Sequence, residues 1–152
     1  LKALVPSIKS FYTNDANSQQ LIATGETPVQ VLLSMNAYHM IEEGVDIKLA
    51  MPKEGAVLGV DAMGINKGSK HADLAYTFMN IALSPEVQAK IAEINRGSPV
   101  VTNATVDPEI AKLPGMLTTA EQWDATLNID PKLRAEKTAE WRKWFSENVM
   151  AH

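Results

Sequence analysis

Asp61 is the residue whose type and setting most suggest chemistry, because it is the one charged side chain between Ala56 and Ile65. Aspartate is disfavoured within a strand, and a buried carboxylate must be hydrogen-bonded or paired with a cation. Two interpretations stay open. Asp61 either faces water at a strand end, or it faces a ligand and pairs with a cationic group. The second interpretation makes it a candidate binding residue.

A cation and an aromatic residue are further candidates. Arg96 precedes Gly97 at a predicted helix end, where it either complements the helix dipole or grips an anionic group of a ligand. Trp123 stands beside Asp124 in a polar segment, so it is harder to assign to a core than a tryptophan on an apolar helix face. We consider both packing and the capping of a pocket for this side chain.

The sequence contains no template for catalysis or for a metal site. It has no cysteine, which excludes thiolate nucleophiles, disulfides and zinc–thiolate sites. The patterns of nucleophile elbows, phosphate-binding loops and zinc peptidases are missing. His39, His71 and His152 stand far apart, and we expect them on helix surfaces rather than around a metal. We therefore expect no enzyme activity, no cofactor and no metal.

Composition excludes several other classes of protein. The 152 residues are 45% apolar and 21% charged, which argues against disorder and for one core or two small lobes. The net charge of -4, without a stripe of Lys and Arg, makes a nucleic-acid partner improbable. No stretch approaches the roughly 20 apolar residues that span a membrane. Because the chain begins abruptly at Leu1, we interpret it as an excised fragment or a processed product.

Alternating apolar segments and helix signals predict an α/β fold with a mainly parallel sheet. Ser84 before Pro85, Asp107 before Pro108 and Asp130 before Pro131 each predict a helix start. Gly25 and Gly44 predict helix ends. Helices are expected over 18–23, 37–43, 71–83, 85–94, a short stretch after 108, and 132–150. Strands are expected over 29–33, 46–51 and 56–65.

An ordered string of short motifs extends through the first 105 residues. A Pro-x-Glu-Gly turn leads to an aspartate, an Ile-x-Lys turn and a helix with Ala-x-x-Phe-x-Asn. The matching residues are Pro52, Glu54, Gly55, Asp61, Ile65, Lys67, Ala75, Phe78 and Asn80, preceded by Gly25, Glu26 and Val29 and followed by Leu83, Pro85, Glu86 and Val87. In this string the chain resembles the spermidine/putrescine-type periplasmic binding proteins of ABC importers.

This resemblance implies part of a two-lobed type II periplasmic-binding-protein fold with a helical tail. Residues 1–58 would supply part of one α/β lobe, and residues 59–105 a hinge strand and helices of the other. Residues 106–152 would form wrapping helices, and the amino-terminal lobe core would be absent.

The resemblance also implies which residues bind the solute. Asp61 falls where relatives place a carboxylate against a ligand ammonium, whereas Leu33, Gly59 and Gly97 replace their aromatic contacts. An Asp61 anchor together with Arg96 suggests an amino-acid-like zwitterion rather than a polyamine. The expected ligand-binding residues are Asp61, Gly59, Ser34, Asn36, Arg96, Trp123 and Asp124.

The implied function is the periplasmic substrate-binding component of an ABC importer for a small amine or amino-acid-like solute, of polyamine or 4-aminobutyrate type. Its partners would be that solute and a transporter permease, and the fragment is expected to dimerise through exposed lobe surface. Two alternatives stay open on the same scaffold, a non-transport α/β enzyme and a cytoplasmic ligand-sensing domain.

Overall fold

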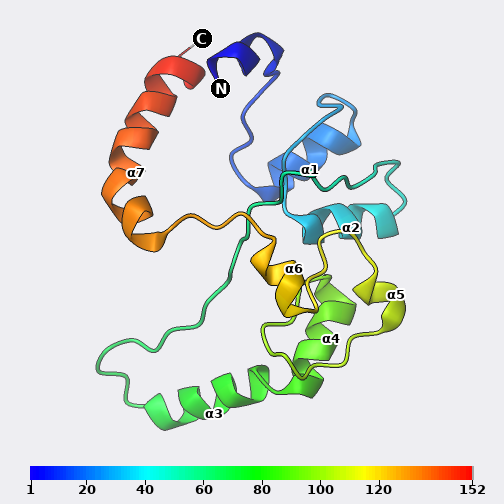
Figure 1. The fold of residues 1–152 in the computed structure, drawn as a ribbon, viewed down its shortest axis with the longest axis vertical. Helices are drawn as coiled ribbons and strands as arrows, with labels where there is room; N and C mark the ends of the chain where they lie inside the picture. Colours follow the sequence, from blue (N-terminus) through cyan, green and yellow to red (C-terminus); the bar gives the residue numbers. More distant parts are fainter. Residues whose placement is uncertain (152) are drawn as a thin grey trace. The chain divides into compact units, whose positions relative to one another are not determined.

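Helices make up the regular structure of residues 1–151, which the computed structural model describes (Figure 1). The chain divides into two compact units. One consists of Leu1–Gln30 and Asn128–His152, and the other of Val31–Leu127. The predicted lobe boundaries at residues 58 and 105 stay predictions.

The first unit contains η1 (Lys2–Ser7), α1 (Asp15–Ala23), α7 (Pro131–Phe145) and the π-helical turn η2 (Ser146–Met150). Asp130 caps α7 by accepting a 2.8 Å hydrogen bond from the amide of Leu133. The rings of Phe11 and Phe145 meet edge to face at 5.8 Å. Aromatic packing thus joins the ends of the chain within this unit.

The second unit contains five α-helices among the residues that the structure describes. They are α2 (Ser34–Glu42), α3 (Ala72–Ala82), α4 (Pro85–Asn95), α5 (Pro108–Ala111) and α6 (Ala120–Asp124). Its buried side chains include Ala37, Tyr38 and Met40 of α2, Ala92 of α4, and Met116 in the segment before α6. Helix α2 is therefore central to the packing of this unit.

The predicted helix signals are confirmed by the structure. Ser84 caps α4 with Pro85 in its first turn, and Asp107 and Asp130 cap the helices that they precede. Gly25 and Gly44 follow helix ends with φ of 73° and 87°, a backbone conformation that glycine adopts without steric cost.

The predicted mainly parallel sheet is wrong for this chain. Residues 1–151 contain no strand, and their one isolated β-bridge is the parallel pair Val57 and Leu127. The amide of Leu127 donates to Ala56 O at 2.8 Å, and that of Leu58 donates to Leu127 O at 3.2 Å. A helix satisfies its backbone locally, whereas a strand exists only beside a partner strand. The apolar runs at 29–33, 46–51 and 56–65 find no such partner within the described chain.

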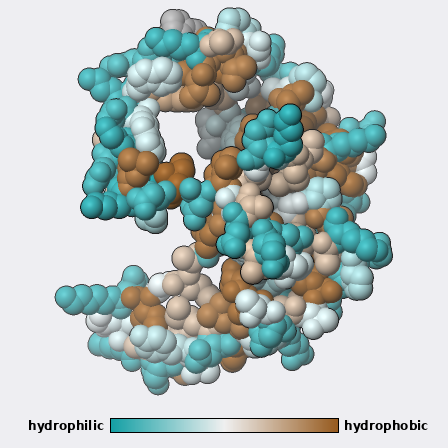
Figure 2. Space-filling view, viewed as in Figure 1, coloured by the Kyte–Doolittle hydropathy of each residue, from teal (hydrophilic) through white to brown (hydrophobic). Residues whose placement is uncertain are grey.

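Large apolar side chains consequently remain open to solvent. Val29 and Val31 are 89% and 86% exposed, and Val57 is 75% exposed. Figure 2 shows apolar surface mixed with hydrophilic surface over the visible face. Such extensive apolar exposure is typical of surface that another polypeptide covers.

Candidate ligand-binding site

The start of α2 lies against the segment that carries Asp61. A methyl group built on Gly59 would lie 3.9 Å from Cδ2 of Leu33, so these two predicted site positions are neighbours. Gly59 is exposed, and a larger side chain there would fill space in front of Leu33. The structure therefore brings together two of the positions at which the resemblance expects solute contacts.

A tight turn at Gly115 packs on the same end of α2. Gly115 has φ of 84°, and a methyl group there would meet Sδ of Met51 at 3.3 Å and Cβ of Ser34 at 3.7 Å. Ser98 Oγ holds this turn by accepting a 2.8 Å hydrogen bond from the amide of Leu117. Ser34 and Ser98 thus both lie close to this turn.

Tyr38 fixes that turn from the middle of α2. Its hydroxyl donates a 2.7 Å hydrogen bond to the carbonyl of Pro114. Burial raises the pKa of Tyr38 above its usual value of 10.0, because the charged phenolate is poorly solvated there. The hydroxyl therefore stays a donor at neutral pH.

Asn36 lies in the first turn of α2 with an unused donor. Its Nδ2 is shielded from solvent and has no hydrogen-bond partner among the described residues. An unsatisfied buried donor costs about 1–3 kcal/mol, so such a group favours an added acceptor nearby.

Asp61 is exposed in an irregular segment, and no ion pair among residues 1–151 involves it. It lies two residues beyond Gly59, where an added methyl group would lie 3.9 Å from Leu33. Asp61 is therefore a free carboxylate close in sequence to the α2 contact.

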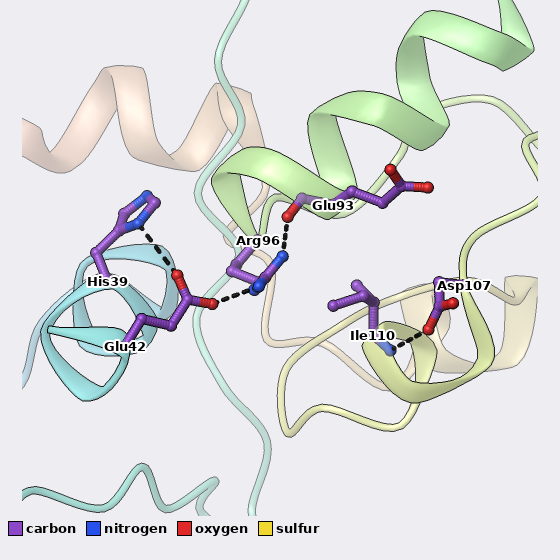
Figure 3. Close-up of polar contacts among 6 residues, drawn as sticks. All are labelled: His39, Glu42, Glu93, Arg96, Asp107 and Ile110. Carbon is purple, nitrogen blue, oxygen red and sulfur yellow. Dashed lines mark hydrogen bonds and ion pairs between the residues drawn. The ribbon is translucent and has the colours of Figure 1, made fainter. Parts of the chain in front are cut away.

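Arg96 lies at the opposite end of α2. Figure 3 shows its guanidinium between the carboxylate of Glu42, which ends α2, and the backbone carbonyl of Glu93 in α4. Ser34 and Glu42 are separated by about 12 Å along the helix, at 1.5 Å per residue. Arg96 thus has protein partners, and these lie away from Ser34.

Trp123 and Asp124 end α6. Trp123 is half-buried, and Asp124 is exposed. Leu127, three residues later, forms the β-bridge to Val57, so α6 leads toward the segment of Gly59. The structure gives Trp123 a place near this segment in the fold but no contact with Asp61.

Three residues that position the site were not expected from the sequence. Gln88, on α4, donates to Ala82 O at 2.8 Å and accepts from the amide of Val100 at 3.0 Å. Ser98 and Glu42 are the other two. Gln88 and Ala92 are both buried and lie four residues apart, on the same face of α4. This helical spacing is the signal in the sequence that could have indicated that Gln88 is buried.

An apolar pocket of ≈ 530 Å³ lies in the first unit, lined by Leu1, Trp141, Arg142, Trp144, Phe145 and Met150. None of the predicted ligand-binding residues lines it. Among residues 1–151 there is no cluster of three or more side chains suited to hold a metal, and no helix has the length and hydrophobicity of a membrane span.

The model of the bacterial extracellular solute-binding protein family matches residues 1–118. The chain belongs to this family. The resemblance to spermidine/putrescine-type binding proteins that the sequence motifs indicated is confirmed by the relatives described next. The names of these relatives describe binding proteins rather than enzymes.

The putrescine-binding periplasmic protein PotF of Escherichia coli (strain K12) is 30% identical over 153 residues, covering 94% of this chain and 41% of that protein. The spermidine/putrescine-binding periplasmic protein of the same organism is 27% identical over 73% of this chain and 32% of its own length. The putrescine/cadaverine-binding protein of Pseudomonas aeruginosa is 38% identical over 44% of this chain and 20% of its own length. The chain thus spans less than half the length of these relatives. No solved structure matches it.

Proposed function

We propose that this chain is part of the substrate-binding component of an ABC importer and that its solute is a small di- or polyamine. The choice of solute rests on the different surroundings of Asp61 and Arg96. Asp61 is an exposed carboxylate without an ion-pair partner in the described chain, whereas the Arg96 guanidinium already pairs with Glu42. Asp61 therefore offers an unpaired negative charge two residues beyond Gly59, which suits an ammonium group.

The relatives support the same solute class. Their names specify putrescine, spermidine or cadaverine, all of which carry ammonium groups on a methylene chain. Leu33 offers apolar surface for such a chain, and Asp61 offers the charge-assisted hydrogen bond.

A 4-aminobutyrate-like solute is the alternative within this function. It would need a cation for its carboxylate, and Arg96 was the sequence-based candidate. The carboxylate of a zwitterion would have to compete for the Arg96 guanidinium with Glu42 and with the carbonyl of Glu93.

The proposed setting is the periplasm and the proposed partner is a membrane permease, as the names and family of the relatives suggest. We propose that the separate 152-residue chain self-associates, because Val29, Val31 and Val57 expose apolar surface.

Calorimetric titration of the full-length protein that carries this chain tests the solute class. We expect putrescine, cadaverine or spermidine to bind, and Asp61→Asn to weaken binding at least tenfold, since hydrogen bonds to charged groups contribute about 1.5–3 kcal/mol. Asp73→Asn, which removes the same charge from the exposed first turn of α3, is the matched control and should bind as the wild type does. Equal affinity for amines in the Asp61→Asn protein would contradict the anchor, and tighter binding of 4-aminobutyrate than of any diamine would contradict the solute class.

A further inference from the structure

Arg96 adopts a backbone conformation that its residue type disfavours. It follows α4 with φ of 56° and ψ of 24°, and it is the one residue other than glycine with positive φ in the described chain. Glycine would adopt this left-handed conformation without cost, as it does after α1 and α2. A side chain that is kept at such a position implies that its contacts compensate for the backbone cost.

Those contacts connect two helices. The Arg96 side chain is 18% exposed, and its guanidinium binds Glu42 at the end of α2 while also donating to the carbonyl of Glu93 in the last turn of α4 (Figure 3). His39 Nδ1 lies 3.8 Å from the other oxygen of Glu42. The cation of this pair is more shielded than Lys90, which is 66% exposed in its pair with Glu93 on the same helix, whereas the Glu42 side chain is itself 44% exposed.

The segment that follows Arg96 is held at two further points. The amide of Val100 donates to Gln88 at 3.0 Å, and Ser98 Oγ accepts from the amide of Leu117 at 2.8 Å. Ser98 also contacts the Gly115 turn, which packs on Ser34. Residues 97–100 therefore run between the ion pair of Arg96 and the end of α2 that carries the candidate site.

We propose that Glu42 and Arg96 form a latch that positions residues 97–100 beside the solute and keeps the guanidinium from competing for it. This inference rests on the proposed function. Both are positioning residues, because neither is placed against the solute. The latch sets specificity in two ways. It holds the loop that adjoins the site, and it neutralises a cation that would repel a diamine and attract a carboxylate.

The latch predicts a change in both loop order and selectivity in the full-length Glu42→Gln protein. Amide hydrogen exchange at Val100 and Leu117, whose amides are hydrogen-bonded in and to this loop, should become at least tenfold faster, because the ion pair that fixes the start of the loop is weakened. The affinity for putrescine should fall by about tenfold relative to that for 4-aminobutyrate. This is the effect of one hydrogen bond between the released guanidinium and the carboxylate of 4-aminobutyrate.

Glu93→Gln is the matched control. It removes the same charge from α4 and breaks the exposed pair with Lys90, yet leaves the backbone carbonyl that accepts from Arg96. Both readouts should equal those of the wild type. A loss of selectivity in Glu93→Gln as large as in Glu42→Gln would show a general charge effect and overturn the latch.

Arg96→Gly provides a second variant that does not depend on the stability of Glu42→Gln. Glycine relieves the left-handed backbone, so folding should be retained while the amide exchange of Val100 and Leu117 still accelerates. Unchanged exchange in both variants would overturn the proposal. Failure of the wild-type protein to bind any amine would sink the proposed function, and the exchange readout would still decide whether the latch orders the loop.

Discussion

At the scale of residues, single polar side chains hold the segments around α2. Tyr38 ties α2 to Pro114, Ser98 ties the loop after α4 to Leu117, and Gln88 joins the end of α3 to Val100. None of these bonds belongs to a helix or a sheet ladder. They connect parts of residues 31–127 that lie far apart in the sequence, as strand pairing would in a sheet.

Tyr38→Phe should lower the free energy of unfolding by about 1 kcal/mol, since it removes one hydrogen bond and leaves the Pro114 carbonyl without its donor. Urea denaturation at pH 7 measures this difference. Tyr76→Phe, at a 62% exposed position, is the control and should unfold as the wild type does.

The difference in stability between the wild type and Tyr38→Phe depends on pH in a defined way. Burial raises the folded-state pKa of Tyr38 above 10.0, so the folded state binds this proton more tightly than the unfolded state. The stabilisation is therefore fully present below pH 10 and is lost as the pH rises through the raised pKa. A wild-type advantage over Tyr38→Phe that shrank between pH 6 and 8 would contradict this assignment.

At the scale of elements, the sequence predicted helices well and strands badly for one physical reason. Helix starts depend on residues within one turn, as at Ser84, Asp107 and Asp130, and each of these is confirmed. A strand depends on a partner far away in the chain. The apolar run at 29–33 has strand composition, but nothing in residues 1–151 pairs with it.

Ser84→Ala should destabilise the protein by about 1 kcal/mol, because Ser84 Oγ accepts the hydrogen bond from the amide of Val87 that caps α4. Ser84→Asp keeps a capping acceptor and places a negative charge at the helix start, so it should restore wild-type stability. Thermal unfolding of the three proteins checks both statements. Equal melting temperatures for Ser84→Ala and the wild type would show that α4 does not depend on this cap.

At the scale of the molecule, the candidate site could be anticipated only in part. Motif order placed Asp61, Gly59 and Ser34 in one site, and the structure brings the segments of Gly59 and Ser34 to the same end of α2. The partner of Arg96 could not be foreseen, because Glu42 lies 54 residues earlier and no pattern connects the two. Exposed apolar side chains in both units likewise indicate surfaces whose partners these residues do not contain.

The separate 152-residue chain should therefore self-associate and bind a hydrophobic dye. Light scattering should give a mass above the 16.6 kDa of one chain, and Val31→Thr with Val60→Thr should reduce both mass and dye binding by lowering the exposed apolar area. A single species of 16.6 kDa without dye binding would be inconsistent with these exposed surfaces.

We propose that this chain forms part of a binding protein for small amines, and this is tested most directly by identifying the solute that the full-length protein carries from its host. Mass spectrometry of the molecule released on denaturing the freshly purified protein should find a di- or polyamine, and the Asp61→Asn protein should carry much less of it. A sugar, an inorganic anion or a metal ion in its place would contradict the account.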